Sequence, residues 1–136
     1  MSKKIETKEP YIEYDICSSD NKFEVREKVA AFDYDHTLVK PKSGVTFSKN
    51  VNDWVWLRDN VPNVLKKLYY DGYSILVFTN QSKQFKLNQI RNVLEELGLP
   101  IRVFIGISKT AQKPSKFMWN KFLEKCENVQ IKGMYV

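Results

Sequence analysis

The sequence predicts an α/β fold in three layers, with helices on both faces of a mostly parallel sheet. Apolar runs without alternation, typical of strands covered on both faces, take turns along the chain with segments whose apolar residues recur at helical spacing. A strand that returns to the sheet through a helix runs parallel to its predecessor. The 136 residues, 43% of them apolar, suffice for one domain with its own core.

Residues 1–27 are expected to form a tail and an edge strand or hairpin outside the main domain. Residues 1–9 are polar and are predicted to be disordered. Residues 11–16 alternate enough for an edge strand, or for a short hairpin with residues 22–25. The main domain is therefore assigned to residues 28–136.

The main domain is expected to begin with a buried strand at residues 28–34, whose apolar run lacks alternation. A helix follows later, because apolar residues between Val61 and Leu68 recur at helical spacing. Pro62 suits the first turn of this helix, and Gly72 suits its C-terminal stop.

Predicted strands and helices continue to follow one another to the end of the chain. Residues 74–79 predict a second buried strand, a helix with apolar residues from Ile90 to Leu97 ends at Gly98, and residues 101–107 predict a third strand. Residues 116–126 read as a third helix entered through Pro114, and residues 130–136 as the start of a fourth strand.

Composition narrows the function classes. The net charge of +6 favours a polyanionic partner. Apolar runs such as residues 75–78 are too short to cross a bilayer and no signal peptide is visible, so we expect an intracellular protein, nuclear or cytoplasmic, without membrane attachment. Cys17 and Cys126 lack metal-ligand spacing, and reduced thiols are favoured over the alternative of a disulfide.

The most informative stretch is residues 30–39, where an apolar run ends on Asp33 and Asp35. Alternate side chains of a strand point to opposite faces, so these two carboxylates leave the strand end on the same side. Such a pair repels itself unless a cation or a shared proton compensates, which suits holding Mg²⁺ while one carboxylate attacks phosphorus. An ordinary Asp-rich turn is the structural alternative.

Other polar residues follow the other predicted strands. Thr79 and Asn80 end the second strand, and Lys113 comes after the third, within residues 108–114. Ligands of parallel α/β sheets bind beyond the carboxyl ends of the strands, so these groups are expected in one place with the two aspartates. Their structural alternatives are a strand end for Thr79, a turn for Asn80 and a solvated charge for Lys113.

The intervals between elements predict an open site, because residues 40–60 and 81–112 leave no room for a separate cap domain. An open site admits a phosphate at the end of a large molecule. Lysines in or beside these loops favour a phosphodiester backbone as the partner. They are Lys40, Lys42, Lys49, Lys83, Lys86, Lys109 and Lys116. Trp54 and Trp56 could stack on a terminal base, although core packing is favoured for Trp54.

The pattern Asp-x-Asp-x-Thr, a strand-terminal threonine and a Lys-Pro before a helix resembles the haloacid dehalogenase superfamily. Within it, an ordered set of motifs resembles the 3′-phosphatase domain of polynucleotide kinase 3′-phosphatase. The set comprises Phe32 to Leu38, Ser43-Gly44 with Phe47, Asp53-Trp54, Gly72-Tyr73, Phe78 to Gln81, Lys113-Pro114 and Met118-Trp119. The resemblance covers residues 28–136 and implies a Rossmann-like, haloacid-dehalogenase-like domain.

The resemblance also implies catalytic roles by position. Asp33 would be the nucleophile that forms an aspartyl-phosphate, and Asp35 the acid that protonates the leaving 3′ oxygen and then deprotonates water. Mg²⁺ would bridge Asp33, the backbone carbonyl of Asp35 and the phosphate. The implied function is a Mg²⁺-dependent polynucleotide 3′-phosphatase that restores 3′-hydroxyl groups at DNA ends in repair.

Substrate contacts are assigned to a second set of residues. Thr79 would hydrogen-bond the phosphoryl oxygens with help from backbone N–H groups around Asn80, and Lys113 would neutralise developing charge. Ser43 and Lys83 complete the predicted substrate-binding set.

Two departures from the family pattern stand out. His36 stands where the family usually has glycine, and its side chain could pack, hydrogen-bond a carboxylate or touch substrate, with packing favoured. Residues 134–136 look like the strand before a fourth family motif, a Gly-Asp that supplies a further metal-binding aspartate, and no such motif follows in the chain. A C-terminal truncation and a degenerate protein with weak activity are both open interpretations.

Two other function classes remain as alternatives. One is a catalytically impaired module that binds nucleic-acid ends, or a fragment of a bifunctional phosphatase with a C-terminal kinase domain. The other is a small-molecule phosphatase of the same superfamily, such as those acting on histidinol phosphate or heptose bisphosphate. Those enzymes typically carry a Cys/His zinc loop, and this chain has one His and no Cys at the expected place.

Overall fold

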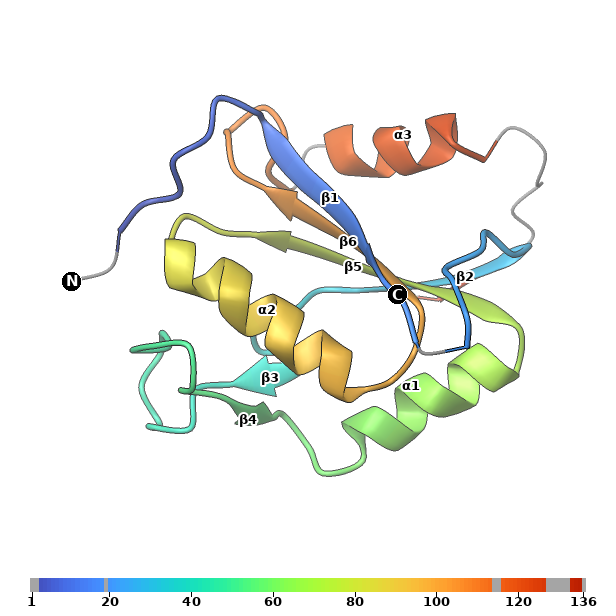
Figure 1. Cartoon of the computed structure of the whole chain (residues 1–136), viewed down its shortest axis with the longest axis horizontal. Coiled ribbons are helices and arrows are strands. Elements are labelled where there is room, and N and C mark those ends of the chain that lie inside the picture. Colours follow the sequence, from blue (N-terminus) through green and yellow to red (C-terminus); the bar gives the residue numbers. More distant parts are fainter. Residues whose placement is uncertain (1–2, 19, 114–115, 127–132, 136) are drawn as a thin grey trace.

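Residues 3–18, 20–113, 116–126 and 133–135 are described by the computed structural model (Figure 1). The elements are β1 Tyr11–Ile16, β2 Lys28–Phe32, β3 Val39–Lys40, β4 Val55–Trp56, α1 Val61–Tyr70, β5 Tyr73–Asn80, α2 Gln84–Glu96, β6 Ile101–Gly106, α3 Phe117–Glu124 and β7 Gly133–Tyr135. Each helix and main-domain strand predicted from the sequence has a counterpart among them, with boundaries that differ by a few residues.

The large sheet has the strand order β1-β6-β5-β2-β7. Pairs β2–β5, β5–β6 and β2–β7 are parallel, as the alternation of strands and helices predicts. β1 pairs antiparallel with β6 at one edge, so the sheet is mixed. The edge-strand prediction for residues 11–16 is confirmed, whereas residues 22–25 form no strand and the hairpin alternative is wrong.

Helices lie on both faces of this sheet, α1 and α2 on one and α3 on the other (Figure 1). Leu65 of α1 and Ile90 of α2 pack in one buried cluster with Ile75. Met118 of α3 packs in a second cluster with Leu76, the next residue of β5. Ile75 and Leu76 thus pack into cores on opposite faces of the sheet. Because both faces of β5 are buried, its sequence does not alternate between polar and apolar residues.

Three segments differ from their predicted structure. The first buried strand ends at Phe32 rather than at residue 34, because the chain turns there and Leu38 N donates to Tyr34 O at 2.9 Å. Residues 3–5, expected to be disordered, pair with the segment before α2. The interval at residues 40–60 overlaps a small antiparallel hairpin of β3 and β4, whose two-residue strands are too short for a pattern to reveal.

Some expectations fall outside the described residues, namely Pro114 at the entry to α3, residues 130–132 and 136 of the fourth strand, and Met1 and Ser2. Within the described ranges, none of the helices combines the length and apolarity that membrane spanning requires.

The turn after β2 contains His36, which has a left-handed φ of 58°. Non-glycine residues pay about 1–2 kcal/mol in this region because Cβ approaches the following carbonyl. The ring compensates in part, since its Nε2 lies 3.0 Å from the Thr46 carbonyl oxygen. The side chain is exposed, so the favoured prediction of packing is wrong and a backbone hydrogen bond takes its place.

His36→Gly and His36→Ala should therefore differ in stability. Both variants lack the hydrogen bond to Thr46, but only glycine relieves the backbone strain. The glycine variant should therefore unfold at higher urea, with a free energy of unfolding about 1 kcal/mol greater than that of the alanine variant. Equal stability of the two variants at equal m-values would show that the turn is unstrained.

Candidate active site

The carboxyl ends of β2 and β5 bring the predicted residues together. Phe32, the last residue of β2, is opposite Val77 in the parallel register, so the chain after β2 runs beside the last residues of β5. Asp33, Asp35, Thr79, Asn80 and Lys113 line one open pocket of about 460 Å³. All four residues predicted to be catalytic are in this set.

Asp33 is held by two donors at one oxygen. Lys113 Nζ lies 2.9 Å from Asp33 Oδ1, and the backbone N–H of Tyr34 donates to the same oxygen at 2.7 Å. Lys113 Nζ also donates to the Phe78 carbonyl at 2.8 Å, which anchors the ammonium at the end of β5. The Asp33 side chain is 49% exposed, and Oδ2 accepts no hydrogen bond from the described residues. One carboxylate oxygen is thus left for a ligand.

Asn80 orients Lys113 through the backbone. Asn80 Oδ1 accepts from Lys113 N at 2.9 Å, and Asn80 Nδ2 donates to Lys113 O at 3.2 Å. These two bonds join the end of β5 to the segment after β6. The side-chain amide of Asn80 is therefore hydrogen-bonded within the protein. The predicted help of backbone N–H groups around Asn80 in binding substrate stays a prediction.

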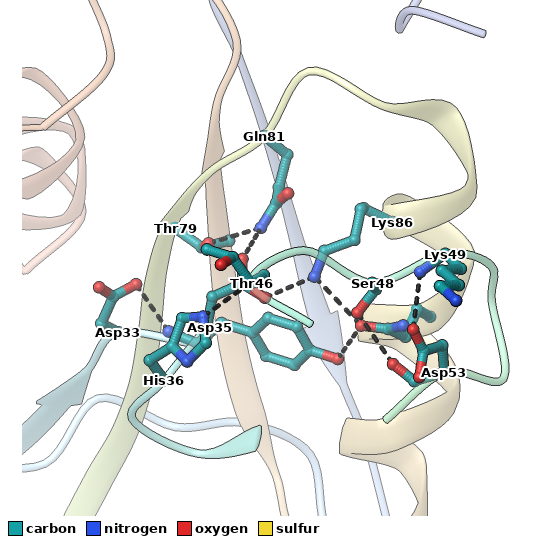
Figure 2. Close-up of polar contacts among 12 residues, drawn as sticks. Asp33, Asp35, His36, Thr46, Ser48, Lys49, Asp53, Thr79, Gln81 and Lys86 are labelled. Carbon is teal, nitrogen blue, oxygen red and sulfur yellow. Dashed lines mark hydrogen bonds and ion pairs between the residues drawn. The ribbon is translucent and has the colours of Figure 1, made fainter. Parts of the chain in front are cut away.

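Asp35 is connected to Thr79 through Gln81 (Figure 2). Gln81 Nε2 donates to Asp35 Oδ2 and to Thr79 Oγ1, both at 2.9 Å. Thr79 is buried, with 1% of its surface exposed. Because its hydroxyl accepts from Gln81, the hydroxyl proton remains available for donation to a ligand oxygen.

A buried lysine holds the other oxygen of Asp35. Lys86 Nζ lies 2.5 Å from Asp35 Oδ1 and 3.2 Å from Gln89 Oε1, and Tyr34 OH donates to Gln89 Oε1 at 2.8 Å. Burial raises the pKa of Tyr34, and the Asp35 charge adds to this, so the phenol stays a neutral donor. Each of these polar groups has a partner, as burial requires.

Sequence reasoning missed the roles of Gln81, Lys86 and Gln89. Lys86 belongs to the lysines expected in or beside the loops, but its side chain is only 8% exposed and is paired with Asp35. Lys86 and Gln89 are three residues apart on α2, a spacing that puts them on one helix face. A lysine and a glutamine on an otherwise apolar face were the available signal.

A second pocket, of about 450 Å³, adjoins the first. It shares Asp35 and Asn80 with the first pocket and adds aromatic and basic side chains, among them Phe47, Phe85 and Lys83. Phe47 is 82% exposed, although large apolar side chains are usually covered. Lys83, predicted to bind substrate, lies in this second pocket.

Ser43 lies elsewhere, in the loop between β3 and β4. Its backbone N–H and its hydroxyl both donate to the Asp53 carboxylate at 2.8 Å, and Lys49 N donates to the same group at 2.8 Å. These hydrogen bonds lower the pKa of Asp53, with the Lys49 N–H as the largest cause. Among the described residues Ser43 does not line the Asp33 pocket, so its predicted role remains a prediction.

The tryptophans beside this loop pack inward. The rings of Trp54 and Trp56 contact each other edge to face, with 5.1 Å between their centroids. Both lie against the buried cluster that contains Leu65 and Ile75. Core packing of Trp54 is therefore confirmed, and Trp56 shares that environment.

Asp33 and Asp35 are the two carboxylates of this pocket that could hold a metal ion. Across the described residues no group of three His, Cys, Asp or Glu side chains converges on one point. Two carboxylates nevertheless fit Mg²⁺, which commonly binds one or two of them and completes its octahedron with water and phosphate oxygens.

Comparison with known proteins finds one family model and several relatives that are similar to this chain. A family model described as polynucleotide kinase 3 phosphatase matches residues 28–136. The chain is 41% identical over 113 residues to a bifunctional polynucleotide phosphatase/kinase of Schizosaccharomyces pombe. It is 34% identical over 113 residues to an uncharacterized 20.8 kDa protein of Autographa californica nuclear polyhedrosis virus, and 29% identical over 104 residues to the polynucleotide 3′-phosphatase ZDP of Arabidopsis thaliana.

These relatives are longer than the matched region. The alignments cover 76%, 76% and 66% of this chain, but the chain spans only 28%, 61% and 15% of the yeast, viral and plant proteins.

The Asp53 hydrogen bonds predict a pH-dependent contribution to stability. A carboxyl whose pKa is lower in the folded than in the unfolded protein stabilises the fold above its unfolded pKa, about 4, and loses this contribution as the pH falls through the folded value. Asp53→Asn should therefore unfold at lower urea than the wild type at pH 7, and this difference should shrink below pH 4.

The exposed Asp59 offers a matched control. Asp59→Asn should show the wild-type urea midpoint at pH 7. A stability difference between wild type and Asp53→Asn that is the same at pH 7 and pH 3 would contradict the role of the ionised carboxylate.

Proposed function

Because the chain belongs to the polynucleotide kinase 3 phosphatase family, we propose that its Asp33 pocket hydrolyses 3′-phosphates at the ends of polynucleotides, with DNA ends as substrate. The observation that carries this proposal is the meeting of Asp33, Asp35, Thr79 and Lys113 in one open pocket. A carboxylate nucleophile, a second carboxyl, a hydroxyl and an ammonium are the groups that phosphate transfer through an aspartate requires.

In the first proposed step, Asp33 attacks phosphorus and the bond from phosphorus to the 3′ oxygen breaks. The products are an aspartyl-phosphate and a 3′-hydroxyl that takes its proton from Asp35. In the second step Asp35 removes a proton from water, the water oxygen attacks phosphorus, and the bond to Asp33 breaks. Inorganic phosphate leaves, and both carboxyl groups return to their starting state.

The surrounding groups are suited to this reaction. Lys113 Nζ, 2.9 Å from Asp33, can balance the charge that develops on the phosphoryl oxygens. Thr79 has a hydroxyl proton to donate to those oxygens, because it accepts from Gln81. Lys86 and Gln81 each hold one oxygen of Asp35, which restricts the carboxyl to a single orientation.

We propose that a divalent cation, Mg²⁺, completes the site. The Asp33 carboxylate and the main chain or carboxylate of Asp35 would hold it, since hard oxygen donors are what this cation prefers. When bound, the cation would supply neutralisation of phosphate charge.

The finer fold and partner assignments are also proposals. Helices on both faces and reactive residues at the carboxyl ends of parallel strands support a three-layer, haloacid-dehalogenase-like arrangement. The yeast relative is named a bifunctional phosphatase/kinase, and this chain spans 28% of it, which supports a kinase domain as companion of this unit.

Asp33→Asn tests the nucleophile. The amide keeps the shape of the side chain but lacks the attacking charge, so release of phosphate from a 3′-phosphorylated oligonucleotide should fall at least about a thousandfold. Asp33 is half exposed, so the melting temperature should change by only a few degrees.

Asp59→Asn, an exposed aspartate outside the pocket, serves as the control and should keep wild-type turnover. Ordinary turnover by folded Asp33→Asn protein would remove the covalent mechanism.

Substrate preference tests the polymer assignment. A 3′-phosphorylated oligonucleotide should be hydrolysed with kcat/KM about tenfold or more above that of a mononucleoside 3′-phosphate or a sugar phosphate, because neighbouring phosphodiesters meet exposed lysines. This advantage should shrink as salt rises from 50 to about 200 mM. Equal kcat/KM for all three substrates would contradict the proposal that the substrate is a nucleic acid.

A further inference from the structure

Residues 3–10, which we name the N-terminal arm, contact the loop after β5 and the loop after β6. The carbonyl of Pro10 accepts from Ile107 N and Ser108 N, after β6, at 3.0 Å each. Nearer the start of the chain, Ile5 N donates to Ser82 O at 3.0 Å. Figure 1 shows the arm running from the start of β1 down to the beginning of α2, past the ends of β5 and β6. The family match begins only at residue 28, so the arm lies outside it.

The arm is fixed to the start of α2 by backbone pairing. Gln84 N, at the first position of the helix, donates to Lys3 O at 2.8 Å. The first N–H groups of a helix have no partner within the helix, so this carbonyl fills a need of the helix itself. The pairing therefore does not depend on the side chains of the arm.

This pairing puts two lysines directly opposite each other. Lys4 and Lys83 form an antiparallel bridge, and opposed residues of such a pair have their Cβ atoms about 5 Å apart on the same side. Both lysines are exposed, and neither has an acidic partner in the described part of the chain. Like charges in this position destabilise the pair. An anion bound between the two ammonium groups would remove that cost.

The position of the pair indicates which anion it would take. Lys83 lines the second pocket, which shares Asp35 and Asn80 with the catalytic pocket. Because the two pockets adjoin, a strand whose terminal phosphate reaches Asp33 has room to continue along the second pocket toward Lys83. The arm also carries exposed Lys3 and Lys8, whose charges are offset by the exposed Glu6 and Glu9, so the phosphate site is assigned to the Lys4–Lys83 pair itself.

From the Lys4–Lys83 bridge we infer a binding site for an internal phosphodiester of the polynucleotide, supplied jointly by the N-terminal arm and the loop before α2. This inference rests on the proposed function, because it concerns the same substrate. It adds residues 3–10 to the surface that binds the strand and leaves the chemistry at Asp33 unchanged.

Lys4→Glu tests the site without undocking the arm. The new carboxylate stands opposite Lys83, a favourable cross-strand pair, so the backbone pairing is retained while the anion site is removed. For a 3′-phosphorylated oligonucleotide of ten residues relative to a mononucleoside 3′-phosphate, the ratio of kcat/KM should fall about threefold to tenfold. The slope of log(kcat/KM) against log salt should become shallower by about 0.7 for each phosphate of a single strand that the variant no longer neutralises.

Lys66→Glu is the matched control, an exposed lysine of α1. It makes the same charge change away from the arm and should leave both the ratio and the salt slope close to wild type. A Lys4→Glu ratio and slope equal to those of Lys66→Glu would overturn the inference, because net charge alone would then explain any effect.

A binding measurement keeps the test separate from turnover. Fluorescence anisotropy with a labelled oligonucleotide that ends in a 3′-hydroxyl reports affinity even if no phosphate is released. Weaker binding by Lys4→Glu than by Lys66→Glu would support the site, and equal binding would overturn it. Failure of the wild type to hydrolyse any 3′-phosphate would instead refute the proposed function, and the anisotropy result would still decide on the arm.

Discussion

Parallel pairing between β2 and β5 is the constraint on which the site depends. With Phe32 opposite Val77, Asp33 follows β2 close to the carboxyl end of β5, where Thr79 and Asn80 are the last two residues of the strand. A shift of the register by one residue would turn every side chain of β2 to the opposite face. Both faces are buried under helices, so such a shift would disrupt two cores at once.

Two kinds of support then hold the reactive groups. On the Asp33 side, Asn80 bonds the backbone of Lys113, and the ammonium of that lysine reaches the carboxylate. On the Asp35 side, the support is a buried polar network that includes Lys86. Networks of this kind specify one geometry when every member is satisfied, because in a low-dielectric interior an unpaired polar group is costly. Asp33 remains half exposed, whereas both carboxylate oxygens of Asp35 accept hydrogen bonds from within the protein.

Much of the fold follows from local pattern. The apolar runs of β2, β5 and β6 and the helical spacing in α1 and α2 are signals within single segments, and the structure has each element there. Proline and glycine mark the ends of α1 as expected, with Pro62 in its first turn and Gly72 at a φ of +99° after it. The hairpin of β3 and β4 and the docking of residues 3–5 have no such signal, because short strands form through partners distant in sequence.

The sequence by itself determined that Asp33, Asp35, Thr79 and Lys113 gather in one pocket, because parallel strands bring the residues at their carboxyl ends to one edge of the sheet. Only the tertiary structure decided which of the many lysines pairs with Asp35. Lys86 differs from its exposed neighbours through burial beside the Tyr34 ring and through partners contributed by other elements, and no local pattern records that environment. Pattern reports the face on which a residue lies, whereas the identity of its partner depends on how distant segments pack.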